Sequence, residues 1–304
     1  MVISAGVYKR DINMKTNKLY QSVMGLVVGD ALGVPYEFAE RMDLDSNPVT
    51  DMTGFGAYNQ PAGTWSDDSS LMLATLESFK RLDKIDCTDI MENFLKWRYD
   101  GKFTPHGTAF GIGRATDTAI NNYKNGMPVT ECGCRGEHDN GNGSLMRILP
   151  LAFIEHTDED IKNVSALTHA HEISIKTCEI YLSVAENLLN GCDIEAAISK
   201  AISEVEITTI FKRLYGIKNI PRSEIHSKGY VVDTIEASMY CLLNTDNYRD
   251  CVLMAVNLGN DTDTTSAVAG GLAGIFYGIG GKKGIPCSWI EKIIRKEWIE
   301  NLCR

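Results

Sequence analysis

Two acidic, hydroxyl-rich segments of the sequence contain the residues best suited to chemistry. Residues 64–70 lead into an amphipathic stretch, and residues 259–265 lead into a run of small and apolar residues that reaches Gly278 without a further charge. The relevant side chains are those of Ser66, Asp67, Asp68, Asp261, Asp263 and Thr264. An ionised carboxylate at the mouth of a buried helix is costly without a partner, because its desolvation costs several kcal/mol. A cation is the simplest partner, so the two segments predict one shared site.

The donor atoms of this set favour hard divalent cations. Oxygen ligands without a matching His or Cys cluster select Mg²⁺, Mn²⁺ or Ca²⁺ over zinc or copper. If Glu37 joins the two segments, as many as five carboxylates share a small volume, and two divalent cations would neutralise most of their charge. Such a pair, about 3.5–4 Å apart, can hold vicinal substrate oxygens and acidify a bound water. The pattern therefore predicts hydrolytic chemistry.

A third polar segment, Asp139–Arg147, contains two glycines around Asn142 and is predicted to open a helix. Free N–H groups and the helix dipole at such a position favour an anion such as a diphosphate. Arg147 is expected either to contact that anion or to form an internal salt bridge. Each acidic pair alone is weak evidence, because Asp beside Ser or Thr is more often a helix cap than a ligand. Their combination with this third segment supports a functional site.

The elements that must position these residues are helices. Apolar residues recur three and four positions apart in most of the chain, and long alternating strand patterns are absent. The predicted helices are Leu19–Leu32, Ser69–Leu82, Asp89–Tyr99, Ile173–Leu189, Ile194–Leu214, Val231–Leu243, Tyr248–Leu258, Ser288–Leu302 and the buried run that follows Thr264. No linker separates two halves. We therefore predict an all-α fold in which residues 1–304 form a single compact multi-helical domain, with residues 1–17 flexible.

Glycine stripes predict how two of these helices pack. Glycine recurs every fourth residue at positions 25, 29 and 33, and again at positions 270, 274 and 278. Such stripes permit close backbone approach. We expect the two helices to be neighbours, which would bring Glu37 towards Asp261 and Asp263.

Bulk composition excludes several other classes of protein. A net charge of −10 and the lack of a basic patch argue against binding to nucleic acid. Nine cysteines form no disulfide pattern, and the N-terminus lacks the apolar core of a signal peptide, so we expect a cytoplasmic protein. The apolar run after Thr264 is of borderline length for a bilayer, and we interpret it as a buried helix rather than a membrane span. Cys132 and Cys134 lack a second pair at zinc spacing, so we assign no zinc site there.

Five segments, taken in order, resemble those of the ADP-ribosylglycohydrolase family, which includes the dinitrogenase reductase-activating glycohydrolases. They are Gly29–Glu37, Trp65–Ser69, Gly141–Arg147, Leu167–His169 and Gly259–Thr264. The resemblance extends from about Leu19 to Gly278. It implies an all-α fold with a dinuclear Mg²⁺ or Mn²⁺ centre. It also implies a hydrolase that cleaves the glycosidic bond between ADP-ribose and a modified acceptor, either a protein side chain such as arginine or a small ADP-ribose conjugate.

The resemblance also implies roles for individual residues. The implied metal ligands are Ser66, Asp67, Asp68, Asp261, Asp263 and Thr264. A carboxylate, that of Glu37 or Asp68, would move protons as general acid or base. The implied substrate-binding residues are Asn142, Gly143, Ser144, His169 and Tyr230. For two of these a purely structural role stays open, since His169 can be a buried histidine bonded to backbone and Tyr230 can belong to the core.

One departure from the family pattern concerns Gly111, where many bacterial relatives carry aspartate. If that aspartate assists proton transfer or substrate positioning, its loss would alter specificity or weaken activity, and Asp117 is the nearest replacement in sequence.

Two alternative functions stay open for this sequence. One is a non-catalytic member such as the jellyfish J1 crystallins or an ADP-ribose-binding relative, because a fold does not guarantee activity. The other is a hydrolase of another ADP-ribose derivative.

Overall fold

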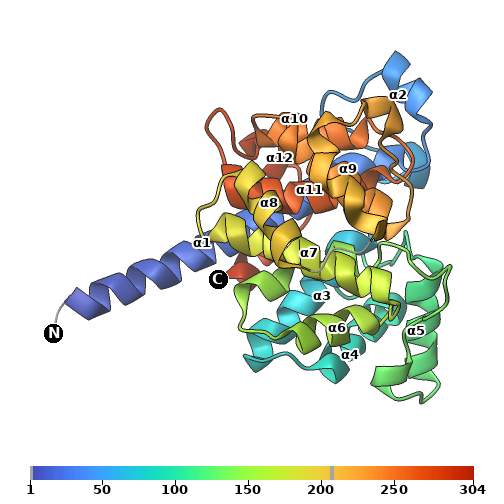
Figure 1. Cartoon of the computed structure of the whole chain (residues 1–304). Coiled ribbons are helices and arrows are strands. Elements are labelled where there is room, and N and C mark those ends of the chain that lie inside the picture. The colour runs from blue at the N-terminus through green and yellow to red at the C-terminus, as the bar shows by residue number, and fades with distance from the viewer. Residues whose placement is uncertain (1–2, 206–208) are drawn as a thin grey trace.

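Helices make up the ordered framework of the chain (Figure 1). The structure is a computed structural model, and it describes residues 3–205 and 209–304. Its α-helices are α1 Ile3–Gly33, α2 Arg41–Ser46, α3 Asp67–Leu82, α4 Cys87–Asp100, α5 Arg114–Lys124, α6 Asp158–Ala166, α7 Glu172–Leu189, α8 Ile194–Glu204, α9 Val231–Leu243, α10 Tyr248–Val256, α11 Thr262–Tyr277, α12 Cys287–Ile290 and α13 Lys296–Cys303. Within the described residues no β-sheet forms, and extended pairing is limited to isolated bridges. The predicted all-α class is confirmed.

Helices α1 and α11 pack against each other along their glycine stripes. A Cβ atom on Gly25 would lie 2.3 Å from the carbonyl oxygen of Gly270, and one on Gly29 would lie 2.1 Å from that of Ser266. Ser266 Oγ in turn donates a hydrogen bond of 2.7 Å to the carbonyl oxygen of Gly29. Only glycine permits backbones to approach this closely. The predicted pairing of the two stripes is confirmed.

This pairing joins the C-terminal end of α1 to the N-terminal end of α11. Thr262 Oγ1 donates a hydrogen bond of 2.8 Å to the carbonyl oxygen of Gly33. A Cβ atom on Gly33 would lie 2.3 Å from Cα of Asp263. The 3₁₀ helix η1, Val34–Tyr36, follows directly and leads the chain to Glu37. The acidic start of α11 and the carboxylate of Glu37 therefore reach the same region.

Helix α1 begins well before the predicted start at Leu19. It starts at Ile3, and its first turns project from the body of the molecule in Figure 1. From Leu19 onward most of its side chains are buried. The flexibility expected for residues 1–17 stays a prediction.

Of two helices that the apolar periodicity predicted as continuous, one ends early and the other is interrupted. Ile194–Leu214 stops at Glu204, residues 206–208 lie outside the described residues, and the 3₁₀ helix η6, Thr209–Asn219, follows. The sequence around this break is rich in β-branched residues, which have low helix propensity. Ser288–Leu302 divides into α12 and α13, because the N–H of Ile294 donates to the carbonyl of Gly63 and Arg295 adopts a left-handed conformation. Tertiary contacts thus outweigh local periodicity there.

The helix predicted to open within Asp139–Arg147 does not form as an α-helix. The segment ends in two short 3₁₀ helices, η4 Leu145–Arg147 and η5 Leu149–Phe153. Pro150 explains this, since proline cannot donate the backbone hydrogen bond of a helix interior and clashes with the preceding turn. The predicted α-helix is therefore wrong for this segment, whereas the anion site expected there stays a prediction.

The long apolar helix that follows the second acidic segment is buried within the protein. All residues of α11 from Thr262 to Ile275 are buried. Within the described residues, no helix combines the length and the hydropathy needed to cross a membrane.

Candidate active site and metal centre

A cavity of about 550 Å³ gathers most of the predicted site residues. Its volume is suited to a small-molecule ligand. From the acidic set it is lined by Glu37, Asp67, Asp261, Asp263 and Thr264. From the predicted substrate set it is lined by Asn142, Gly143 and His169. Residues far apart in the sequence thus meet at one cavity.

The carboxylates form two adjoining clusters. Carboxylate oxygens of Asp30, Asp68 and Asp263 all lie within 4.8 Å of one another, and so do those of Glu37, Asp261 and Asp263. Asp263 belongs to both clusters and therefore links them. Each cluster is compact enough for its oxygens to share one cation.

Burial makes the ionised form of these carboxylates unfavourable. Desolvation, and then the charge of Asp68, raise the pKa of Asp67 well above its usual range. Desolvation followed by repulsion from Glu37 does the same to the pKa of Asp263. Desolvation raises the pKa of Glu37 to about 7, with further repulsion from Asp261. So dense a group of acids requires either bound protons or bound cations.

Two carboxylate oxygens in the clusters favour bound cations over bound protons. Asp68 Oδ2 accepts hydrogen bonds from Ser66 Oγ at 2.8 Å and from Thr264 Oγ1 at 3.4 Å. Asp68 Oδ1 and Glu37 Oε2 are both buried without a hydrogen-bond partner among the described residues. Unpartnered buried oxygens are rare in folded proteins and call for an explanation. The clusters could hold metal ions, and the two unpartnered oxygens are available as ligands.

Asp30 belongs to this site, although the sequence analysis assigned it no role. Its side chain accepts hydrogen bonds from the backbone N–H groups of Ser66 and Ser69 and from Ser69 Oγ. It therefore fixes the N-terminal end of α3, which begins at Asp67, against α1. Desolvation raises its pKa to about 6. An acid inside an otherwise apolar stretch of α1 is the sequence signal that could have identified it.

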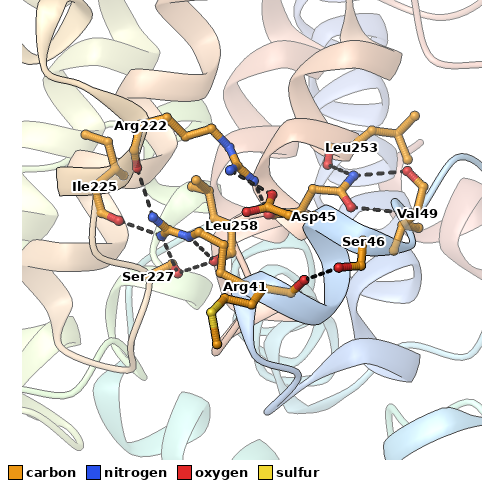
Figure 2. Close-up of polar contacts among 11 residues, drawn as sticks. Arg41, Asp45, Ser46, Val49, Arg222, Ile225, Ser227, Leu253 and Leu258 are labelled. Carbon is orange, nitrogen blue, oxygen red and sulfur yellow. Dashed lines mark hydrogen bonds and ion pairs between the residues drawn. The ribbon is translucent and has the colours of Figure 1, made fainter.

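A network of backbone contacts fixes the loop before α11. The N–H of Asp261 donates to the carbonyl of Ser227 at 2.9 Å. Ser227 Oγ contacts the carbonyl of Gly259, and Arg41 donates from Nε to the carbonyl of Leu258 at 2.8 Å. Figure 2 shows the Arg41 side chain among the carbonyl oxygens of these two loops. Arg41 therefore joins the two loops that hold Asp261 in place.

The glycine-rich segment reaches the acidic clusters through Asn142. Its Nδ2 atom donates to Asp261 Oδ2 at 2.8 Å and to Thr234 Oγ1 at 2.9 Å. At the neighbouring position, a Cβ atom on Gly143 would lie 2.7 Å from His169 Cε1. Glycine at 143 is thus needed to accommodate the imidazole at the cavity wall.

Four predicted residues do not line the cavity. Ser66 and Asp68 are buried behind the acidic residues that do. Ser144 is fully buried, and its hydroxyl accepts from Cys178 Sγ at 3.6 Å. Tyr230 is half-buried and pairs through its backbone with Gly141, whereas the preceding Lys228 and Gly229 form the wall. Lys228 and Gly229 carried no recognisable signal in the sequence.

Gly111 lies directly against Asp67, one of the acidic residues that line the cavity. Its φ angle is +81°, and a Cβ atom there would lie 2.5 Å from Asp67 Oδ1. The Asp117 side chain, considered as a replacement for an acid at 111, instead pairs with Arg98 at 2.7 Å. Asp117 is not among the cavity-lining residues. The backbone around Gly111 is thus shaped for a residue without a side chain.

Helix α5 was not predicted from the sequence, and its N-terminal turn borders the cavity. Gly113, Arg114, Ala115 and Thr116 all line it. Arg114 pairs with Asp139 at 2.7 Å and remains largely exposed. The buried face of α5 consists of small residues and one isoleucine, so it lacks the large apolar side chains that mark the predicted helices. This helix N-terminus replaces the one predicted near Asn142.

Comparison with known proteins places the chain in a family. The sequence model of the ADP-ribosylglycohydrolase family matches residues 12–304. A solved structure described as an ADP-ribosylglycohydrolase-related protein complex superposes with a TM-score of 0.81 at 28% sequence identity, covering 96% of this chain and 97% of its own. The chain belongs to the ADP-ribosylglycohydrolase family.

Characterised relatives are similar over most of their length. The ADP-ribosylarginine hydrolase Tri1 of Serratia proteamaculans is 32% identical over 292 residues, which cover 94% of this chain and 78% of that protein. The ADP-ribosyl-[dinitrogen reductase] glycohydrolase of Rhodospirillum rubrum is 30% identical over 280 residues, covering 90% of this chain and 89% of that protein. The chain is accordingly a hydrolase that releases ADP-ribose from a modified acceptor.

Proposed function

We propose that the chain hydrolyses the N-glycosidic bond between ADP-ribose and the arginine side chain of a modified protein, with two divalent cations, Mg²⁺ or Mn²⁺, as cofactors. The single observation that carries the cation proposal is the pair of carboxylate clusters that share Asp263, with buried oxygens left unpartnered beside them. Arginine is proposed as the acceptor because two relatives are named ADP-ribosylarginine hydrolases.

The proposed metal ligands come from both acidic segments. They are Ser66, Asp67, Asp68, Asp261, Asp263 and Thr264. When bound, the cations would orient the ribose hydroxyls and stabilise the charge that develops as the glycosidic bond breaks. Asp30 is proposed as a support for this set, because it anchors the backbone of Ser66 and Ser69.

Glu37 is the better of the two candidates for proton transfer. A general acid or base must approach the substrate to hydrogen-bond distance, directly or through one water. Glu37 lines the cavity and has an unpartnered oxygen, whereas Asp68 lies behind the wall with one oxygen engaged by two hydroxyls. We therefore assign proton transfer to Glu37 and only ligation to Asp68.

The part of the cavity wall formed by the glycine-rich segment, His169 and the start of α5 suits the ADP part of the substrate. Asn142, Gly143 and His169 supply polar groups there, and Arg114 and Lys228 supply positive charge. The N-terminus of α5 adds backbone N–H groups without helical partners, which favour an anion. We propose that the diphosphate binds between Arg114 and His169. Ser144 and Tyr230 would act by packing behind this wall.

An aromatic rim supports a guanidinium acceptor. Phe38 lines the cavity mouth with 70% of its surface exposed, held at a positive φ of 69° by a hydrogen bond from its N–H to the carbonyl of Asn260. Glu40 lies beside it. An aromatic face and a carboxylate together recognise a planar cation.

The nine cysteines, all unpaired, support a reducing compartment such as the cytoplasm for this reaction.

The decisive experiment measures release of ADP-ribose from arginine-linked, serine-linked and O-acetyl substrates, each with Mg²⁺, with Mn²⁺ and with chelator. We expect the fastest release from the arginine-linked substrate and none with chelator. Asp67→Ala and Asp261→Ala should abolish release while the far-ultraviolet circular dichroism spectrum keeps its helical form. Undiminished release by either variant would refute the ligand assignment, and ADP-ribose binding without turnover on all three substrates would favour a non-catalytic role.

A further inference from the structure

Arg147 is fully buried, although its guanidinium has no carboxylate partner within the described residues. Its Nη2 atom donates to the carbonyl of Val164 at 3.0 Å and to Thr168 Oγ1 at 2.9 Å. The ring of Phe94 lies 4.9 Å from its central carbon. Burial lowers the pKa of Arg147 to about 10, so the group stays charged at neutral pH. A buried charge without an opposite charge is costly, and such costs point to a role beyond packing.

The hydrogen bond from Arg147 fixes the role of the Thr168 hydroxyl. Arginine can only donate, so Thr168 Oγ1 accepts from it. Thr168 is fully buried, and within the described residues the only acceptor that its own proton can reach is His169 Nδ1, at 2.8 Å. If the imidazole donated instead, the hydroxyl proton would be left buried without a partner, which costs free energy. Thr168 therefore donates to His169, and Nδ1 is the accepting nitrogen.

The other nitrogen of His169 must then bear the proton, and it faces the cavity. His169 is one of the wall residues. Cβ atoms on Gly141 and Gly143 would each lie 3.4 Å from His169 Nε2, so this nitrogen borders the glycine-rich segment. No hydrogen bond from Nε2 to another described residue exists. The Nε2–H group is thus free to donate to a ligand.

We propose that Arg147 and Thr168 are positioning residues that hold His169 as the neutral Nε2–H tautomer, so that it donates a hydrogen bond to a diphosphate or ribose oxygen of the substrate. The identity of the ligand that accepts this hydrogen bond rests on the function proposed above, whereas the tautomer of His169 does not depend on it. His169 is accordingly a binding group and not a general base.

The charges around His169 agree with this assignment. Burial, together with the positive charges of Arg147 and Arg114, lowers the pKa of His169 to about 3 against the opposing charge of Asp139. The imidazole consequently stays neutral throughout the range in which the enzyme would work. An imidazolium would also have to give up its bond from Thr168, because Nδ1 would carry a proton.

Nuclear magnetic resonance of ¹⁵N-labelled full-length protein tests the tautomer directly. The chain has six histidines, and His169→Gln assigns the relevant signal. We expect ¹⁵N shifts of an Nε2–H imidazole that do not titrate between about pH 5.5 and 8. In Thr168→Val the tautomers should mix, whereas Thr168→Ser, which keeps the hydroxyl, should retain the Nε2–H form. An Nδ1–H tautomer in the unmodified protein, or a pure Nε2–H form in Thr168→Val, would overturn the proposal.

Kinetics on the ADP-ribosylated arginine substrate test the consequence for binding. Thr168→Val should raise KM about tenfold with little change in kcat, since the lost orientation affects ground state and transition state alike. His169→Gln, which presents an amide N–H near the position of Nε2, should lose less affinity than His169→Asn. Equal KM values in the Gln and Asn variants would contradict donation from Nε2. If the Nε2–H tautomer of His169 is found but no substrate is hydrolysed, the assignment of Arg147 and Thr168 as positioning residues stands and the proposed function fails.

Discussion

Asn142 donates a hydrogen bond of 2.8 Å from Nδ2 to Oδ2 of Asp261, although the two residues are 119 positions apart in the sequence. The second hydrogen of the same amide goes to Thr234 Oγ1. Asn142 therefore orients a carboxylate of the acidic clusters as well as lining the cavity. Because Asp261 is a proposed metal ligand, Asn142 would act as a group that orients it, and loss of such a group typically lowers metal affinity about 10–100-fold.

Replacing Asn142 by alanine should weaken cation binding. Without the amide, Asp261 is free to turn away from Glu37 and Asp263, so we expect the affinity for Mn²⁺ to fall by about 10–100-fold. Isothermal titration calorimetry measures this affinity. The control is Asn163→Ala, at an exposed position of α6, which should leave the affinity unchanged. Equal Mn²⁺ affinity in both variants would disprove the orienting role.

Gly29→Ala should destabilise the protein strongly. The added methyl group would lie 2.1 Å from the carbonyl oxygen of Ser266, and neither backbone can move without opening the α1–α11 contact. Overpacking of this kind costs about 1–3 kcal/mol or more. Urea unfolding of Gly29→Ala and of a control, Gly216→Ala, provides the comparison. Nothing lies within 4 Å of a Cβ atom at 216, so the control should change stability by less than about 0.5 kcal/mol.

Introducing aspartate at position 111 should impair the site rather than improve it. Gly111 has a φ of +81°, and the new Cβ would lie 2.5 Å from Asp67 Oδ1. We expect Gly111→Asp to lower cation affinity and ADP-ribose release together, and Gly111→Ala to cause a smaller loss in both. The assay is release of ADP-ribose at several Mg²⁺ concentrations. Faster release by Gly111→Asp would mean that this chain lacks a catalytic acid that its site can accommodate.

The metal-free protein should become less stable as the pH rises. Burial raises the pKa of Asp30 to about 6 and that of Glu37 to about 7, above their unfolded values of about 4. The folded state then binds more protons than the unfolded state, and the stability that these protons contribute is lost as the pH rises through the folded pKa values. In chelator, the urea concentration at the unfolding midpoint should decrease as the pH is raised from about 5 to 8. Mg²⁺ should restore this midpoint most at the higher pH. Glu37→Gln should flatten the decline. A midpoint that rises across this range without metal would contradict the electrostatic account.

The sequence predicted contacts correctly where a residue type has few physical reasons to occur at its position. Glycine stripes at Gly25 and Gly270 predicted a backbone contact, because only close approach makes so many glycines useful in helices. The same stripes, by making the two helices neighbours, predicted that Glu37 would meet Asp261 and Asp263. Both inferences depend on the close backbone approach that glycine permits.

Other features depend on tertiary contacts that leave little trace in local sequence. The buried face of α5 is built from small residues, so the helix has few large apolar side chains by which to recognise it. Arg147 was expected to contact an anion or to form an internal salt bridge, whereas the structure buries it beside Thr168. The break before α13 follows from a hydrogen bond between Ile294 and Gly63, which are far apart in the chain. These outcomes are decided by packing partners and not by the segment itself.

Crystallography with Mn²⁺ and ADP-ribose tests most directly whether the two acidic clusters bind cations beside the substrate. Such crystals should give anomalous difference density between Asp67 and Asp263. We expect two manganese ions, both ligated by Asp263, with the ribose hydroxyls turned towards them. ADP-ribose bound in the cavity with no anomalous peak near Asp263 would contradict the proposed metal centre.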